Sequence, residues 1–250
     1  MSGHSKWSSI KHKKAVKDAR RGKLFSKLIK ELTVAARLGG GDTNANPRLR
    51  TAVQTARANS MPNENIERAI KKGTGELEGA TYEEVSYEGY GPGGVAILCS
   101  VVTDNRNRTV ADVRRLFEKH GGSLGTAGCV AWMFHKRGVI SVAQSSADEE
   151  RIMEVALDAG ADDVTDSGDG CCEVVTAPET FEAVRAALQG AGIEPASAEV
   201  AMVPDNTVRV SGKEAEQTLR LLEGLDDHDD VQSVASNADF SQEELQRLSA

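Results

Sequence analysis

The order of secondary-structure signals between residues 136 and 205 constrains the fold more than any other feature of the sequence. Hydrophobic runs bounded by turn residues predict strands at GVISVAQ, DDVTDSG, CCEVVTA and EPASAEVAMVP. Amphipathic periodicity predicts helices at DEERIMEVALDAGA and PETFEAVRAALQGAG. The order is therefore strand, helix, strand, strand, helix, strand, which is that of a ferredoxin-like unit. We expect residues 136–205 to form one ferredoxin-like domain.

Signals on both sides of this unit predict an α+β domain into which it is inserted. Before it, TYEEVSYEGYG and GVAILCSVVT predict two strands, TVADVRRLFEKHGG predicts a helix capped by Thr109 and Asp112, and GCVAWMF predicts another strand. After it, EAEQTLRLLEGL and DVQSVASNAD predict one helix and one strand, too little for a domain of their own. We expect residues 80–135 and 206–240 to form one α+β domain, interrupted by the acidic ferredoxin-like insertion.

The start of the chain, residues 1–75, predicts a small α-helical domain. Apolar residues recur at helical spacing from Phe25 to Ala36, and the three glycines at 39–41 end this helix. A second helix begins at NPRL with Asn46 as its N-cap, and a third, in MPNENIERAIKKG, is expected to end before Gly73. The predicted fold class is thus multidomain α and α+β.

Charge is distributed very unevenly along the chain. The formal net charge is −8, yet residues 1–72 hold 17 Lys or Arg against 5 Asp or Glu, and residues 73–250 hold 13 against 33. The first segment therefore carries +12 and the second −20. Such asymmetry indicates a polyanion-binding segment on a body that does not share that partner.

The basic charge is densest between Lys6 and Lys30, where ten Lys or Arg accompany a single acid, Asp18. A solvated helix face usually mixes both signs, because opposite charges at i,i+4 stabilise the helix. Ten to one is not mixed, so we predict that this segment binds nucleic acid and that its aromatic side chains add stacking surface. The predicted nucleic-acid-binding residues are Lys6, Trp7, Lys11, His12, Lys13, Lys14, Lys17, Arg20, Arg21, Lys23 and Lys27.

Two other motifs have alternative interpretations. The loop GYGPGG matches the dinucleotide pattern GxGxxG, but a strand follows it where that site needs a helix, so we interpret it as a hairpin turn. The loop TDNRNRT precedes a helix, and Asn105, Arg106 and Arg108 are a candidate anion-binding site. The alternative is that its Asn and Asp residues only form the turn and cap the helix.

Several kinds of site are not expected. The four cysteines show no CxxC spacing and no histidine close by at metal-ligand spacing, so we predict no metal site, and no motif predicts a cofactor. The run DDHDD at 226–230 is interpreted as a solvated acidic corner. No apolar run reaches the roughly 18 residues of a membrane span, and no hydrophobic segment follows the N-terminal charges. We therefore expect a cytoplasmic protein.

The predicted insertion does not have the composition of an RNA-binding platform. Its central strands contain no aromatic residue, and residues 136–205 carry 4 basic against 15 acidic residues. Contact with other proteins or the ribosome, or a scaffolding role, suits this domain better.

Long motifs spread over nearly the whole chain resemble the YebC/PmpR family, which includes mitochondrial translational activators. They are MSGHSKWSSIKHKKAVKDARRGKLFSKLIKELTVAAR, NPRLRTAV, MPNENIERAIKKGTG, YEGYGPGGVA, TDNRNRT and DHDDVQSV. Cys129, which stands where the family often has Ser, and VASNAD, which lacks the family's usual aromatics, depart from the pattern. The resemblance implies a helical domain followed by two α+β domains, one inserted in the other.

The resemblance also implies a cytoplasmic, non-enzymatic DNA-binding transcriptional regulator. Other members act on translation at the ribosome and relieve stalls, so a ribosome-associated factor that binds ribosomal RNA is the alternative. A phosphate-handling enzyme built around Arg106 and Arg108 is a remote alternative, because no catalytic base lies near them in sequence.

Overall fold

The first three helices of the described residues form a domain with its own hydrophobic core. The structure, a computed structural model, describes residues 18–167 and 170–249. The helices are α2 (Asp18–Gly39), α3 (Pro47–Ala58) and α4 (Asn63–Thr74), and they enclose a cluster that includes Leu32 and Leu49. The predicted cap of the second helix is confirmed, since the Asn46 side chain accepts a hydrogen bond from the Leu49 N–H.

The end of the third helix differs from the prediction. Gly73 lies inside α4, and the left-handed residue that ends the helix is Gly75, with φ 83°. A Cβ atom at Gly73 would lie 2.4 Å from the carbonyl oxygen of Thr33 in α2. Gly73 is therefore a point of close helix–helix packing and not a helix stop.

The next part of the chain forms a four-stranded antiparallel sheet with the order β3-β1-β2-β9. Two helices, α5 and α8, cover one face of it, and their apolar residues, such as Phe117 and Leu222, pack against Ile97 and Cys99 of β2. The elements are β1 (Glu83–Tyr90), η1 (Pro92–Gly94), β2 (Ala96–Thr103), α5 (Arg106–Lys119), β3 (Ser123–Leu124), α8 (Gly212–Asp226) and β9 (Val231–Ser236). The expected hairpin turn at GYGPGG is confirmed by η1.

The predicted capping residue of α5 is wrong. The N-cap is Asn105, whose side chain accepts from the Arg108 N–H, so the helix begins at Arg106. Thr109 is buried within the first turn instead. Asn is as effective an N-cap as Ser or Asp, and its earlier position in the sequence decides where the helix starts.

The predicted strand GCVAWMF is also wrong. Residues Ala131–Met133 form a short 3-10 turn, η2, and the strand β4 begins only at Phe134. Val130 and Phe134 pack against Ala96, Leu98 and Ala235, on the face of the first sheet that α5 and α8 do not cover. The apolar residues that suggested a strand thus anchor a turn.

The second sheet is antiparallel with the order β5-β6-β4-β7, and α6 and α7 pack on it. Its elements are β4 (Phe134–Ala143), α6 (Glu149–Asp158), β5 (Ala161–Asp166), β6 (Cys171–Thr176), α7 (Phe181–Gly190) and β7 (Ser197–Pro204). Three further elements were not expected from the sequence: β8 (Val208–Val210), β10 (Ala238–Phe240) and α9 (Gln242–Ser249). Helices and antiparallel sheets together confirm the multidomain α and α+β class.

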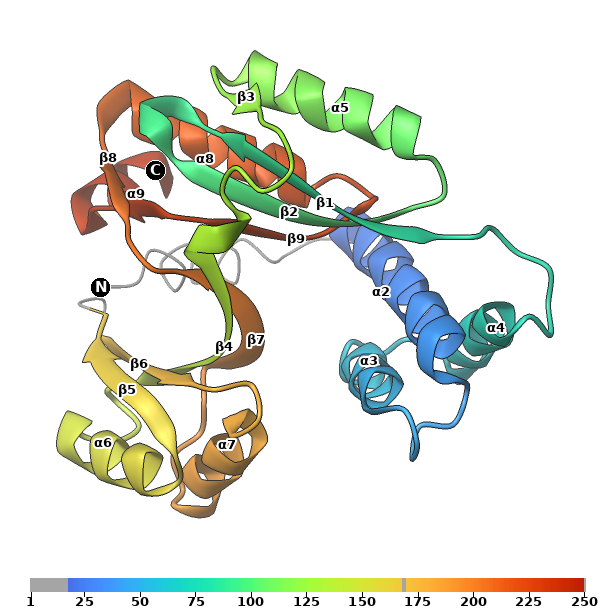
Figure 1. Cartoon of the computed structure of the whole chain (residues 1–250). Coiled ribbons are helices and arrows are strands. Elements are labelled where there is room, and N and C mark those ends of the chain that lie inside the picture. Colours follow the sequence, from blue (N-terminus) through green and yellow to red (C-terminus); the bar gives the residue numbers. More distant parts are fainter. Residues whose placement is uncertain (1–17, 168–169, 250) are drawn as a thin grey trace.

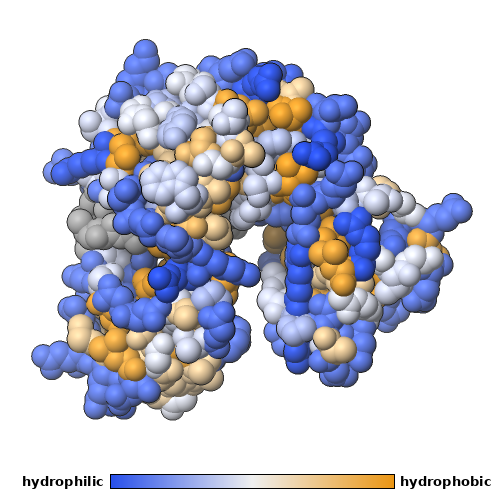
Figure 2. Space-filling model, in the orientation of Figure 1, coloured by the Kyte–Doolittle hydropathy of each residue, from blue (hydrophilic) through white to orange (hydrophobic). Residues whose placement is uncertain are grey.

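The three parts form an arch (Figure 1). The first sheet, with α5 and α8, lies at the top, and the helical domain and the second sheet extend from it on opposite sides. The strands β4 and β7 connect the two sheets (Figure 1). Figure 2 shows an open notch between the lobes, and a surface on which hydrophilic side chains predominate.

Candidate nucleic-acid interface

The structure describes only part of the predicted basic surface. Arg21, Lys23 and Lys27 lie in the first turns of α2, and the Arg21 guanidinium lies 5.4 Å from the centre of the Phe25 ring. Arg20 is in the same helix, but its side chain lies outside the described part. The other predicted residues also lie outside the described residues: Lys6, Trp7, Lys11, His12, Lys13, Lys14 and Lys17.

Three lysines on one face of α2 contact the end of α8. The Nζ atoms of Lys23 and Lys27 lie 3.1 and 2.5 Å from the carbonyl oxygens of Asp227 and Asp226. Lys30 Nζ lies 2.9 Å from the carbonyl oxygen of Asp229. The last carbonyls of a helix have no intrahelical partner and carry negative partial charge, so the lysines bind the C-terminus of α8. The run DDHDD is therefore not a solvated corner but the docking site of α2.

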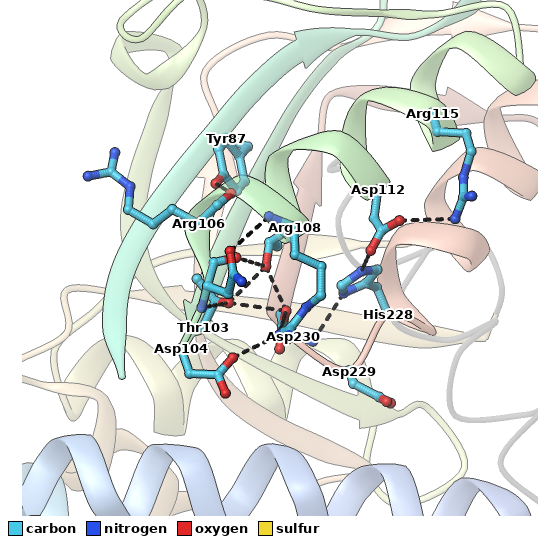
Figure 3. A network of polar contacts seen from close by, with 12 residues as sticks. Tyr87, Thr103, Asp104, Arg106, Arg108, Asp112, Arg115, His228, Asp229 and Asp230 are labelled. Carbon is cyan, nitrogen blue, oxygen red and sulfur yellow. Dashed lines mark hydrogen bonds and ion pairs between the residues drawn. The ribbon is translucent and has the colours of Figure 1, made fainter. Parts of the chain in front are cut away.

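Asp230 is the centre of this contact (Figure 3). Its carboxylate is buried and accepts from Lys30 at 2.5 Å and from Arg108 at 3.1 Å. The hydroxyl groups of Thr103 and Thr109 lie 3.2 and 2.6 Å from its Oδ2 atom. Burial alone would raise the pKa of Asp230, but the hydrogen bonds from Lys30, Thr109 and Arg108 outweigh it and hold the pKa far below its ordinary value.

The candidate anion site occupies the other side of this network. The Arg108 guanidinium is already bound by two carboxylates, those of Asp104 at 2.8 Å and Asp230 at 3.1 Å. The exposed Arg106 side chain extends away from the network (Figure 3), and its Nη1 atom lies 3.9 Å from a carboxylate oxygen of Glu83. Asn105 caps α5, which is the alternative that the sequence left open. The anion site stays a prediction, and an anion there would compete with Asp104 and Asp230 for the charge of Arg108.

A second ionic contact joins the helical domain to the first sheet. Arg48 of α3 binds Glu31 of α2 through Nε and Nη2, at 2.7 and 2.9 Å, and Glu84 of β1 through Nη1 and Nη2, at 3.1 and 2.6 Å. The hydrogen bonds to Glu31 and Glu84 raise the pKa of Arg48. One guanidinium thus links two helices to a strand of the neighbouring domain.

The contact between the helical domain and the first sheet is mainly polar. Among the described residues, the hydrophobic clusters of the two parts share no member. A cavity of about 550 Å³ lies at their junction, and its lining carries both signs of charge, including Lys23, Lys30, Asp104, Arg108 and Asp229. Because ion pairs hold the two parts together, we expect their relative position to depend on salt.

Replacing Arg48 with Gln is expected to lower the free energy of unfolding by about 1 kcal/mol. The guanidinium is partly exposed, with 39% of its side chain accessible, so solvent weakens both of its ion pairs. Arg50, which is exposed and has no ion pair within the described part of the chain, provides the control as Arg50→Gln. Urea denaturation of both variants makes the comparison, and equal midpoints would show that Arg48 does not stabilise the contact.

The described part of the chain contains neither a candidate metal-binding group nor a membrane-spanning helix. Within it, no group of three or more His, Cys, Asp or Glu side chains is placed to hold a metal ion. Among the described helices, none is both long and apolar enough to cross a membrane.

Known protein families match this chain in two parts, with a boundary between the helical domain and the first sheet. Residues 5–76 match the family described as TACO1/YebC protein N-terminal domain, and residues 82–238 match TACO1/YebC second and third domain. The chain belongs to the TACO1/YebC family. The resemblance seen in the sequence motifs is thereby confirmed.

Individual relatives of this TACO1/YebC chain align over nearly all of it. A "probable transcriptional regulatory protein" of Desulforapulum autotrophicum is 61% identical over 97% of this chain and 98% of its own length. One from Geobacter sulfurreducens is 58% identical, over 99% and 100%. The crystal structure of a conserved hypothetical protein from Aquifex aeolicus is 47% identical, has a TM-score of 0.79, and covers 90% of this chain and 93% of that one.

Sequence reasoning missed the contact between α2 and the acidic run. The available signal was that Lys23, Lys27 and Lys30 fall on one helix face, at i, i+4 and i+7. That spacing suits a structured acidic partner as well as a polyanion. The partner lies about two hundred residues away in the chain, which no local pattern indicates.

Proposed function

We propose that this protein is a nucleic-acid-binding regulator of gene expression, and in the first place a DNA-binding transcriptional regulator. The observation that carries the proposal is the separation of charge, +12 in residues 1–72 against −20 in the remainder. Relatives that align over its whole length are named probable transcriptional regulatory proteins, which supports the regulatory role. We propose a cytoplasmic location and no enzymatic activity.

The proposed grip on phosphates uses the basic residues of the N-terminal domain. Lys23 and Lys27 donate hydrogen bonds to backbone carbonyls at the C-terminus of α8, so they contribute less to phosphate binding than residues nearer the N-terminus. The main contacts are assigned to Lys6, Lys11, Lys13, Lys14, Lys17, Arg20 and Arg21, with Trp7 and His12 beside them. The net negative charge of residues 73–250 disfavours nucleic acid over most of the remaining surface.

The alternative function is a ribosome-associated translation factor that uses the same basic segment on ribosomal RNA. It is supported by the same charge separation, and the acidic lobes would then contact ribosomal or other proteins. The remote alternative, a phosphate-handling enzyme at Arg106 and Arg108, has the least support because Arg108 is already bound to Asp104 and Asp230.

We also infer that the second sheet unit is a ferredoxin-like domain inserted into the first. The strands lie in the order β5-β6-β4-β7 in the sheet. Along the chain, α6 lies between β4 and β5, and α7 lies between β6 and β7, which supports this assignment. The proposed boundaries are 1–75, 80–135 plus 206–240, and 136–205.

Arg68→Ala is expected to reduce affinity for duplex DNA less than Lys13→Ala combined with Lys14→Ala, and to leave sequence preference unchanged. The helices α3 and α4 are joined by a short link, as in a helix-turn-helix, but α4 exposes Glu64 and Glu67 to solvent. The Arg68 guanidinium lies 2.6 Å from Glu64, so this carboxylate competes with base edges for it.

Competition between a target duplex, a scrambled duplex and ribosomes tests this prediction together with the proposed function. Loss of a base contact would change discrimination by about 1–3 kcal/mol, which the assay resolves. A large loss of sequence preference in Arg68→Ala would show that α4 reads bases. Tighter, saturable binding to ribosomes than to either duplex would favour the translation factor.

A further inference from the structure

Two aromatic side chains are exposed at the junction of the two sheets. Trp132, in the turn η2, is 67% accessible, and Tyr90, at the end of β1, is 39% accessible. Neither belongs to the hydrophobic clusters formed by the described residues. Both polar groups donate to one acceptor, the Cys129 carbonyl oxygen, from Trp132 Nε1 at 3.2 Å and from the Tyr90 hydroxyl at 3.1 Å. The two rings are therefore held close together by a shared backbone atom.

A buried carboxylate holds the turn that carries this acceptor. Glu88, 6% exposed, accepts backbone N–H groups of Gly128, Val130 and Ala131 at 2.6, 2.8 and 2.7 Å. Burial alone would raise the pKa of Glu88, but these three hydrogen bonds outweigh it and lower the pKa. Gly128 has φ +84°, a conformation that favours glycine. The turn is thus fixed before any ligand arrives, and with it the orientation of the aromatic pair.

The surroundings of the pair favour an anionic partner. From Lys119 to Ala147 the sequence contains no Asp or Glu, although the chain as a whole holds 38 of them. His135, Lys136 and Arg137 lie on β4, three to five residues after Trp132 in the sequence. His135 and Arg137 are paired with Asp205 and Asp162, whereas the Lys136 side chain is exposed and has no hydrogen bond or ion pair within the described part of the chain.

We propose that Trp132 and Tyr90 form a stacking site for an unpaired nucleobase, and that Lys136 binds a neighbouring phosphate of the same strand. This rests on the proposed nucleic-acid binding and adds a second contact, on the acidic body, that is specific for single strands. Bases stack on aromatic faces without regard to sequence, while the bases of a duplex are already stacked and paired. Fixing the rings in advance lowers the entropic cost of the contact.

The test uses fluorescence of the full-length Trp7→Phe variant, in which Trp132 is the remaining one of two tryptophans. The probes are a 12-nucleotide RNA, the DNA strand of the same sequence, and the corresponding duplex. Binding is followed separately by the anisotropy of an end-labelled strand. We expect both single strands to quench the Trp132 emission and the duplex to bind without quenching it.

Substitutions measure the contribution of the ring. Trp132→Ala is expected to weaken single-strand binding by about 5- to 150-fold and to change duplex binding by less than about 2-fold. Trp132→Phe keeps a stacking face and should retain most of the affinity. Because Trp132 is exposed, equal urea midpoints are expected for both variants and show that the fold is intact.

Two results would overturn the stacking site while the phosphate grip stands. One is single-strand binding with unchanged Trp132 emission, and the other is unchanged affinity in Trp132→Ala. Loss of ribosome binding in Trp132→Ala with unchanged RNA binding would assign the pair to a protein partner and would also contradict the proposal. If the unmutated protein binds none of the three probes, the proposed function itself fails.

Discussion

Replacing Asp230 with Asn is expected to lower the free energy of unfolding by about 3 kcal/mol, because it breaks a buried ion pair and leaves its cations without a charge partner. The Lys30 side chain, 12% accessible, loses its charge partner and keeps only neutral acceptors, among them the carbonyl of Asp229. Arg108 loses one of its two carboxylates. The amide of Asn also presents a donor to Thr103 and Thr109, whose hydroxyl groups now face an acceptor. Urea denaturation measures the loss.

Asp229→Asn provides the matched control, since it makes the same change of charge one residue away. Its side chain is exposed, and its backbone carbonyl, which binds Lys30, is unaffected by the substitution. We expect this variant to lie within about 0.5 kcal/mol of the unmutated protein. Equal losses in the two variants would show that the general charge of the acidic run, and not the buried network, stabilises the contact.

The same network makes the contact sensitive to acid. The folded-state pKa of Asp230 lies below its unfolded value, so the carboxylate contributes fully to stability above about pH 5. That contribution falls as the pH drops below about 4 and disappears as it passes the folded-state pKa. The difference between the unmutated protein and Asp230→Asn should therefore shrink in acid.

Local signals in the sequence predicted most individual elements. The Asn46 cap, the glycine hairpin and the alternation of strands and helices depend on neighbouring residues, and the structure has them. The predictions fail where contacts with residues far away in the sequence determine the local structure. GCVAWMF forms a turn because Glu88, about forty residues earlier, accepts hydrogen bonds from three of its backbone N–H groups. No periodicity within seven residues reveals a carboxylate on another strand.

The candidate site was predicted less completely than the fold. The charge separation identifies the basic segment, but the sequence alone did not show that Lys23, Lys27 and Lys30 contact the end of α8. It also gave Trp132 no role, because exposure of a tryptophan depends on the tertiary position of its turn. Both features depend on contacts between segments far apart in the chain.

Reversing four charges near the N-terminus is expected to abolish most nucleic-acid binding. The variant changes Lys13, Lys14, Arg20 and Arg21 to Glu and so removes four of the seven cations assigned to the phosphate contacts. Each lost contact should flatten the dependence of log K on log salt by about 0.9. A control variant makes the same change of net charge at four exposed cations of the first sheet domain: Arg114, Lys119, Arg209 and Lys213. The control should keep the unmutated slope.

The salt dependence of duplex binding by the full-length protein tests the phosphate grip most directly. With about five phosphates neutralised, log K should fall against log salt with a slope of about −4 to −5. Affinity should then drop about 250- to 1,000-fold between 50 and 200 mM salt, and the four-charge variant should show a flatter slope of about −1 to −3. A flat salt response in the unmutated protein, or an equal slope in the four-charge variant, would contradict the account.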